Sequence, residues 1–239
     1  MFFLRCLLIL LISISTSFAY KFLAYNPQFG NSHVNFIGKI TDALVDAGHE
    51  VVVVSPVHDT SVGSAGTKKA RVIEIPRCEG TREMYEWMHR PNGAIHNVWR
   101  TQDPMALFKE FDRMFTGWIA QCEALLSHPG LIEQLKEEKF DVAYAEGLDL
   151  CGWGLFHMVG INKTAVTQSM SQIDESIVTQ IASVPSYVPT LMATTGDKMT
   201  FSERAFNLFL IVFNQYFGWR NLPRVQKPFL HIPGFPNLV

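Results

Sequence analysis

Residues 21–56, KFLAYNPQFGNSHVNFIGKITDALVDAGHEVVVVSP, predict a strand, a helix and a second strand in succession. The apolar run at 21–25 is followed by a loop rich in residues that favour turns. Across 32–47, apolar side chains recur at intervals of three and four residues, which is the pattern of a helix with one buried face. The apolar run at 50–55 then forms the second strand. A strand, helix and strand in so short a span form a β-α-β unit, whose two strands are parallel.

The ends of this helix carry the residues that helix ends prefer. Ser32 is the predicted N-cap, because its hydroxyl can accept a hydrogen bond from the first turn. Gly48 is predicted just after the last turn, where the backbone adopts a conformation that favours glycine. The four consecutive valines at 51–54 indicate burial on both faces of the second strand. The sequence therefore predicts a sheet with helices on both sides.

The alternation of strand and helix continues through the rest of the chain. Further strands are predicted at 71–75, 140–145 and 164–168, and further helices within 104–138, at 151–159 and from Thr200 onward. The 104–138 region is expected to split into two helices at His128-Pro129-Gly130. At the start of the last predicted helix, Thr200 and Glu203 have the spacing of a capping box. Alternation of this kind predicts an α/β fold with an open parallel sheet.

The composition of the 239-residue chain narrows the class of function. Hydrophobic residues make up 48% and charged residues 18%, which allows a substantial core and disfavours disorder. The net charge is −2, so there is no surplus of positive charge to neutralise phosphates. Binding to nucleic acid is therefore not expected.

The first nineteen residues have the organisation of a signal peptide. Arg5 supplies a positive charge, residues 7–12 a short apolar run, and residues 17–19 a small-x-small cleavage pattern. The apolar run is shorter than the roughly 20 residues that span a bilayer. Residues 20–239 are therefore expected to enter the secretory pathway, where Asn162-Lys163-Thr164 is a candidate glycosylation site.

The cysteines that remain after residue 19 are Cys78, Cys122 and Cys151. Their spacings match neither a disulfide framework nor a zinc site. At most one disulfide is expected in the oxidising secretory compartment, with one thiol left free.

Residues 205–219, AFNLFLIVFNQYFGW, are the best candidate for a membrane-associated segment in the rest of the chain. The segment is short for a membrane span and is interrupted by Asn207, Asn214 and Gln215. Two interpretations remain, a buried or groove-lining helix and a helix that lies on a membrane surface. Few lysines or arginines flank the segment, which favours the buried helix.

Two predicted strand ends carry residues suited to proton transfer. His33 follows the first strand, and Glu146 and Asp149 follow the 140–145 strand. In a parallel sheet both ends lie on the same edge, where open α/β folds bind ligands. Imidazole can take a proton from an attacking hydroxyl, and a carboxylate on its other ring nitrogen fixes the tautomer and stabilises the imidazolium. The sequence therefore predicts a contact between His33 and a carboxylate.

Spacing alone leaves other interpretations of these residues open. A histidine at a helix start is commonly a cap or a solvated side chain, and Asp149 can cap the helix that begins near Leu150. Rival active sites find less support. The sequence has no GxGxxG after the first strand, no GxxxxGK[ST] and no GxSxG, which disfavours a dinucleotide site, a P-loop and a serine hydrolase.

These residues resemble those of the UDP-glycosyltransferase family, specifically of the animal, nematode-like UDP-glucuronosyltransferases. The resemblance runs from the signal peptide almost to the C-terminus. Ser32-His33 and the GHEV at 48–51 repeat the family's opening pattern, and 140–152 is similar to the region of its catalytic carboxylate. The most specific similarity is PSYVP at 185–189 followed by DKMTFSER at 197–204.

The resemblance implies the N-terminal, Rossmann-like domain of a GT-B glycosyltransferase, which binds a small lipophilic acceptor. His33 matches the family's base, which activates the acceptor hydroxyl. Glu146 stands where most members have an aspartate, so its longer side chain makes Asp149 an alternative partner. The implied reaction transfers glucuronic acid, or another sugar, from a UDP-sugar with inversion at the anomeric carbon. No metal or other cofactor is implied, because the UDP-sugar is a co-substrate.

The resemblance covers only part of the family's architecture. The family's UDP-sugar signature, C-terminal membrane span and basic tail have no match in residues 20–239, so the chain is expected to supply the acceptor site and the base and to be inactive alone. The alternative is a non-catalytic chain that binds lipophiles or pairs with full-length relatives. Residence in the lumen of the endoplasmic reticulum, with a membrane anchor where the C-terminal span is present, is implied in the same way.

Overall fold

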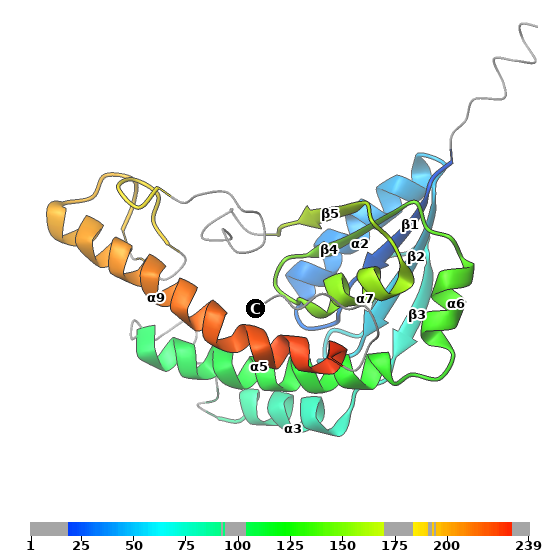
Figure 1. Ribbon diagram of the computed structural model, residues 1–239, viewed down its shortest axis with the longest axis horizontal. Coiled ribbons are helices and arrows are strands. Elements are labelled where there is room, and N and C mark those ends of the chain that lie inside the picture. Colours follow the sequence, from blue (N-terminus) through cyan, green and yellow to red (C-terminus); the bar gives the residue numbers. More distant parts are fainter. Residues whose placement is uncertain are drawn as a thin grey trace, which may run out of the picture.

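A computed structural model describes residues 19–91, 93, 104–169, 184–190, 193 and 195–230. Five parallel strands form one sheet in the order β3-β2-β1-β4-β5 (Figure 1). The strands are β1 (Lys21–Tyr25), β2 (Glu50–Pro56), β3 (Arg71–Ile75), β4 (Val142–Glu146) and β5 (Thr164–Thr167). The helices are α2 (Asn31–Asp46), α3 (Glu79–Met88), α5 (Pro104–Leu126), α6 (Leu131–Glu137), α7 (Cys151–Val159) and α9 (Phe201–Gln226), followed by the 3-10 turn η1 (Lys227–Phe229). The predicted α/β fold with a parallel sheet is confirmed, whereas the signal peptide expected at 1–19 lies almost wholly outside the described residues.

Strand β1 lies at the centre of the sheet and pairs with β2 on one side and with β4 on the other. Leu23 and Ala24 of β1 are fully buried, as are Val52 and Val53 of β2. From β1 the chain moves outward in one direction through β2 and β3, and in the other direction through β4 and β5. The sheet therefore has a topological switch point between β1 and β4, which is where open α/β proteins bind ligands.

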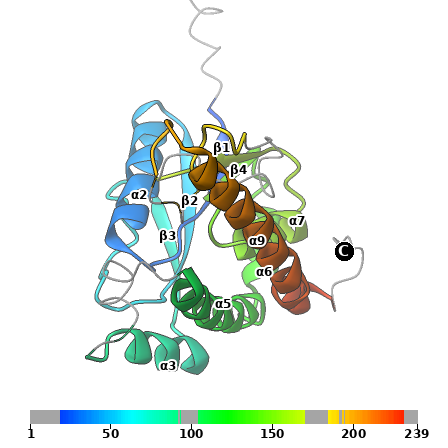
Figure 2. The same cartoon turned by 90° about the vertical axis from the view of Figure 1, so that its left-hand side faces the viewer.

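Helices cover both faces of the sheet (Figure 2). On one face, Ile37 of α2 packs into a core with Val51 and Val53. On the other face, α5, α6 and α7 share a larger core with the alternate side chains of the same strands, including Leu23 and Val52. Successive side chains of a strand point to opposite faces, so the run of valines supplies both cores, as predicted.

The two ends of α2 confirm one cap prediction and correct the other. Gly30, with an extended backbone, is the N-cap, and the helical hydrogen bonds begin with Val34 N–H donating to Gly30 O at 3.0 Å. The prediction of Ser32 as the N-cap is therefore wrong, because Ser32 lies inside the first turn, where its side chain is exposed. Gly48 follows the helix with φ of 89°, as predicted.

Strand β4 lies slightly further along the chain than predicted. It begins at Val142 rather than at residue 140, and Asp141 just before it bonds Lys21 twice, through its backbone N–H to the Lys21 carbonyl and through its carboxylate, which accepts the Lys21 N–H, each at 2.8 Å. Its last residue is Glu146, which was predicted to follow the strand. Strand β5 ends at Thr167, one residue earlier than predicted.

Helix α3 has no counterpart among the predicted elements. Its buried residues are Thr81, Met84 and Tyr85, and most of its other residues are charged or polar, so it lacks the apolar content of the predicted helices. Tertiary packing on α5 holds it in place, and the Thr81 hydroxyl donates to the Gly117 carbonyl at 2.8 Å. The split between α5 and α6 falls at 127–130, as predicted.

Helix α9 has the predicted capping box but not the predicted burial. The Thr200 hydroxyl accepts from Glu203 N–H, and the Glu203 carboxylate accepts from Thr200 N–H. Exposed apolar side chains follow one face of the helix: Phe201, Leu208, Phe209, Val212, Tyr216 and Trp219. The prediction of a buried or groove-lining helix at 205–219 is therefore corrected only in its first form: the inner face is buried, whereas this face is exposed, and exposure does not contradict a groove-lining helix. No helix within the described ranges is long and apolar enough to cross a membrane.

The polar residues of α9 explain this correction. Asn207 is buried, and its amide donates to the carbonyls of Pro185 and Val188 at 2.9 and 2.8 Å. Asn221 is also buried and donates to the Phe217 carbonyl. Asn207 thus anchors the inner face to the 184–190 segment, whereas the Asn221 bond lies within the helix, and many of the aromatic residues are left outside.

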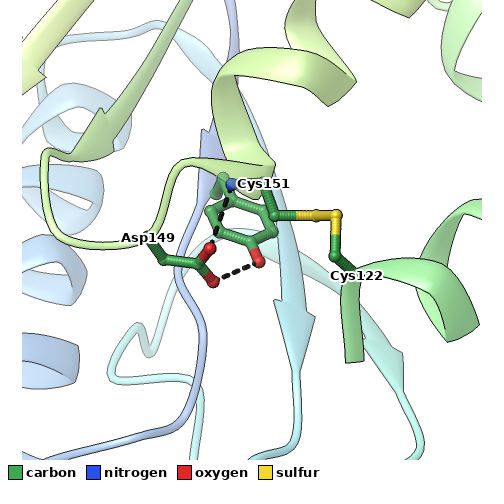
Figure 3. Close-up of a disulfide and its surroundings, with 4 residues drawn as sticks. Cys122, Asp149 and Cys151 are labelled. Atoms are coloured by element: carbon green, nitrogen blue, oxygen red, sulfur yellow. Dashed lines mark hydrogen bonds between the residues drawn. A yellow bond between two sulfur atoms is a disulfide. The ribbon is translucent and has the colours of Figure 1, made fainter. Parts of the chain in front are cut away.

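A disulfide between Cys122 and Cys151 links α5 to the start of α7 (Figure 3). Cys78 is not disulfide-bonded. The expectation of at most one bridge with one thiol outside it is confirmed.

Candidate active site

His33 and Glu146 reach one edge of the sheet from different elements. α2 starts soon after β1, which places His33 in its first turn, and Glu146 is the last residue of β4. The parallel register of β1 and β4 pairs Tyr25 with Ala145, one residue before Glu146. Both residues therefore lie at the switch point between β1 and β4.

The His33 ring and the Glu146 carboxylate are in direct contact, as predicted. Nδ1 of His33 lies 2.9 Å from Oε1 and 2.8 Å from Oε2 of Glu146. Because a carboxylate only accepts hydrogen bonds, we assign the ring proton to Nδ1, which leaves a lone pair on Nε2. The side chains are 19% exposed for His33 and 4% for Glu146. The geometry is that of an imidazole base oriented by a buried carboxylate.

Ser169, which follows β5, completes this cluster. Its backbone N–H and its hydroxyl both donate to Oε1 of Glu146, at 3.1 and 2.5 Å. Its Oγ also lies 2.7 Å from Nδ1 of His33. Ser169 was not among the predicted site residues. The signal that would have found it is its place at the carboxyl end of a third parallel strand, next to the strand that carries Glu146.

The environment of Glu146 favours its ionised form. Burial acts to raise the pKa of this carboxyl, but the hydrogen bonds from His33 and Ser169 outweigh burial and hold the pKa below its ordinary value. The carboxyl is therefore a carboxylate near neutral pH. It can stabilise a positive charge that forms on the adjacent imidazole.

Asp149, the other candidate partner, faces different groups. Its Oδ2 accepts the Tyr25 hydroxyl at 2.7 Å, and its Oδ1 accepts the Cys151 backbone N–H at 3.0 Å (Figure 3). Burial raises the pKa of Asp149 to about 6. The carboxylate in contact with His33 is thus Glu146, and Asp149 holds the start of α7.

Aromatic rings line one side of His33. The Phe29 ring lies 4.7 Å from the His33 ring and 5.2 Å from that of Trp118, measured between centroids. Phe115 packs edge-on against Trp118 at 5.8 Å. Trp118 and Phe115 belong to the Phe-rich region of α5. This arrangement places an apolar wall beside the imidazole.

A small hollow lies behind this wall, between α5, α7 and the end of α9. Its lining consists of Phe115, Trp118, Ile119, Cys122, Asp149, Leu150, Cys151 and Val225. It borders Asp149 and the disulfide but not His33, so it is adjacent to the candidate site and not its centre.

His58 is a further buried histidine in this region. It is fully buried, with its ring 6.2 Å from that of Trp118 and 6.3 Å from that of Tyr85. Burial lowers the pKa of His58 to about 3, so the ring is neutral at physiological pH. Neither ring nitrogen has a hydrogen-bond partner among the described residues.

Two other expectations concern surface and metal sites. Asn162, the candidate glycosylation residue, is exposed in the turn between α7 and β5. In the part of the chain that the structure describes, no group of three or more His, Cys, Asp or Glu side chains is arranged to hold a metal ion.

Comparisons with known proteins place this geometry in context. A family model described as "UDP-glucoronosyl and UDP-glucosyl transferase" matches residues 23–230. The ugt-48 protein of Caenorhabditis elegans, whose name describes it as a UDP-glucuronosyltransferase, is 30% identical, with a match over 80% of this chain and 36% of that protein. UDP-glucuronosyltransferase 1A8 of Rattus norvegicus is 27% identical over 74% of this chain and 33% of that protein. The solved structure of the calicheamicin glycosyltransferase CalG4 is 15% identical, covers 84% of this chain and 43% of that one, and has a TM-score of 0.39. The chain spans about a third of the length of the two transferase relatives.

Proposed function

Because the chain belongs to the UDP-glucuronosyl and UDP-glucosyl transferase family, we propose that residues 20–239 form the acceptor-binding domain of a glycosyltransferase, with His33 as the base. The observation that carries the proposal is the 2.8 Å contact between His33 Nδ1 and Glu146, which leaves the Nε2 lone pair to accept a proton. Glu146 is proposed to orient the ring, in place of the aspartate of most members.

The proposed reaction is a direct displacement at the anomeric carbon of the sugar. Nε2 of His33 takes the proton of the acceptor hydroxyl while the hydroxyl oxygen forms a bond to that carbon. The bond from the carbon to the β-phosphate oxygen of UDP breaks, and UDP leaves with the electron pair. Attack from the side opposite the leaving group inverts the configuration. Glu146, ionised near neutral pH, stabilises the imidazolium that forms.

The proposed acceptor is a small lipophilic molecule with a nucleophilic hydroxyl. Phe29 and Trp118 support this choice, because an apolar and aromatic wall beside the base favours apolar and aromatic ligands. The net charge of −2 gives no reason to expect a polyanionic partner.

The proposed donor is a UDP-sugar, with UDP-glucuronate preferred because the similar proteins from worm and rat are named as glucuronosyltransferases. We propose that the donor is bound by a region corresponding to the remaining length of these relatives. Residues 20–239 alone would then lack an electrophile near His33, and such positioning accounts for roughly 7–11 kcal/mol of an activation barrier. The chain alone is therefore expected to be inactive.

The proposed location is the lumen of the endoplasmic reticulum. The disulfide between Cys122 and Cys151 supports an oxidising compartment, and the exposure of Asn162 is compatible with glycosylation there. The leader at residues 1–19 is proposed to direct the chain to this compartment, and a C-terminal span, as in relatives, to anchor the enzyme in the membrane.

The test uses residues 20–239 fused to the remaining part of the ugt-48 relative. We expect the fusion to conjugate 1-naphthol with UDP-glucuronate, and His33→Ala to lower kcat roughly 10²- to 10⁴-fold, the contribution of a general base. His128→Ala is the matched control, because His128 is exposed in the turn before α6 and should leave kcat unchanged. An active fusion in which His33→Ala retains wild-type kcat would overturn the proposal.

The chain alone and the fusion also distinguish the proposed function from the alternative. In the alternative, the chain is a non-catalytic lipophile-binding or regulatory subunit that pairs with full-length relatives. Calorimetry with 1-naphthol would show binding to the chain alone under either function. Binding by the chain, together with an inactive fusion and a change in the activity of a co-expressed full-length relative, would favour the subunit.

A further inference from the structure

The glutamate at position 146 must be held in place more firmly than an aspartate would need to be. Its side chain has one more rotatable bond, and fixing each such bond costs conformational entropy. A carboxylate that swings away from His33 no longer orients the ring. Both oxygens of Glu146 nevertheless lie within 2.9 Å of His33 Nδ1. This placement requires a further contact that holds the carboxylate beside the ring.

Ser169 supplies that contact with two donors from one residue. Its backbone N–H and its hydroxyl converge on Oε1 of Glu146 at 3.1 and 2.5 Å. We propose that Ser169 is a positioning residue, which holds the Glu146 carboxylate against His33 and thereby fixes the Nδ1–H tautomer of the ring. The inference rests on the proposed function of His33 as the base.

The pairing of β5 with β4 in the parallel sheet places Ser169 next to the Glu146 carboxylate. β5 pairs with β4 so that Thr167 lies opposite Glu146, and the Thr167 hydroxyl donates to the Ala145 carbonyl at 3.1 Å. Neighbouring strands lie about 4.8 Å apart. A residue just beyond the end of β5 therefore reaches the carboxylate with its backbone as well as with its side chain.

The hydrogen-bond directions fix where the ring proton lies. The hydroxyl of Ser169 has one proton, which it donates to Glu146, so toward His33 its oxygen can only accept. Nδ1 of His33 thus faces three oxygen acceptors, two from Glu146 and one from Ser169. A lone pair on Nδ1 would be repelled by all three. The proton belongs on Nδ1, and the Nε2 lone pair points away from the cluster.

The first experiment is an NMR titration of the whole chain, labelled with ¹³C at glutamate carboxyls and ¹⁵N at histidine rings. We expect Ser169→Ala to raise the pKa of Glu146, because a hydrogen bond to its charged form is lost. The same variant should increase the Nε2–H tautomer of His33 in the ring ¹⁵N shifts. Ser169→Thr keeps both donors and should restore both signals.

Thr167→Val is the matched control for this experiment. It removes a hydroxyl from the end of the same strand, where that hydroxyl bonds a backbone carbonyl and not the cluster. It should leave the Glu146 titration and the His33 tautomer unchanged. A merely structural role of Ser169 would predict the same result for Thr167→Val and Ser169→Ala.

The second experiment measures conjugation by the fusion with the ugt-48 relative. Ser169→Ala should lower kcat about tenfold with little change in KM for the acceptor, and it should have no further effect in a Glu146→Ala background, because it acts through Glu146. An unchanged Glu146 titration in Ser169→Ala overturns the inference, whatever the activity of the fusion. A shifted titration with kcat indifferent to His33→Ala instead removes the proposed function and leaves the Ser169 contact established.

Discussion

Asp149 is a buried carboxyl held by two neutral donors, the Tyr25 hydroxyl and the Cys151 backbone N–H. Burial raises its pKa from 3.8 to about 6 against the effect of these bonds. The folded chain therefore binds this proton more tightly than the unfolded chain does. As a result, the free energy of unfolding falls as the pH rises from about 4 to about 6.

Asp149→Asn should remove this loss of stability, because an amide keeps the shape of the side chain without an ionisable proton. Relative to wild type, the variant should gain about 3 kcal/mol between about pH 4 and about pH 7, the energy equivalent of a shift of about two pKa units. Urea unfolding at a series of pH values measures the difference. Asp197→Asn, at an exposed position, is the control. A difference between wild type and Asp149→Asn that does not vary with pH would contradict this expectation.

The sequence could predict the meeting of His33 with a carboxylate but not which carboxylate takes part. The prediction needs only that two parallel strands end at the same edge of a sheet. Glu146 is the last residue of β4, whereas Asp149 lies three residues later, beyond the strand, where its carboxyl accepts hydrogen bonds from Tyr25 and Cys151. Ser169 was missed because its role depends on the pairing of β5 with β4, which no local pattern reveals.

At the scale of the element, α9 carries leucines in two environments. Leu210 is 1% exposed on the inner face, whereas Leu208 is 51% exposed on the outer face. The two residues have the same helix propensity and lie within one turn of each other. They form a matched pair for measuring what burial contributes to this helix.

Leu210→Ala should lower the free energy of unfolding by about 2–3 kcal/mol, through lost burial and the cavity left behind. Leu208→Ala should change it by less than about 0.5 kcal/mol, as exposed substitutions do. Thermal and urea unfolding of the two variants provide the comparison. Equal losses at the two positions would show that the outer face of α9 is covered in solution.

Helix α9 also shows what limits a prediction at this scale. The small number of lysines and arginines that flank 205–219 favoured a buried or groove-lining helix. Which face of α9 is buried depends instead on hydrogen bonds. The Asn207 amide donates to two backbone carbonyls of the 184–190 segment. This contact between two separate segments of the chain, 184–190 and α9, had more influence on burial than the composition of 205–219. The capping box, which needs only Thr200 and Glu203, was predicted correctly because it is local.

At the scale of the whole molecule, the disulfide fastens α5 to the start of α7. The cysteines are 29 residues apart, and closing a loop of that length removes conformational entropy from the unfolded chain worth about 3–4 kcal/mol. Cys122→Ser with Cys151→Ser should lower the free energy of unfolding by about that amount. Cys78→Ser should leave it nearly unchanged, because Cys78 is outside the bridge. Equal stability of the double variant and wild type in urea unfolding would contradict the expectation.

The α/β fold class was predictable from the alternation of strands and helices along the sequence. The order of the strands in the sheet was not. Each β-α-β unit can be predicted from a short stretch of sequence, because it consists of an apolar run, an amphipathic helix and another apolar run. The place of β4 beside β1 rests on contacts across a wide gap in sequence, since Asp141 bonds Lys21 from 120 residues away. The switch point, and with it the candidate site, follows from that long-range pairing.

This pairing also sets the order in which a ribosome can complete the domain. β1 is the first strand to leave the exit tunnel, yet it is the central one. Its second neighbour, β4, is synthesised only after α5 and α6. Until β4 emerges, the nascent chain exposes an unpaired edge of its central strand, and such edges can pair with strands of other chains. The edge that carries His33 and Glu146 is completed late, because β5 and Ser169 follow β4.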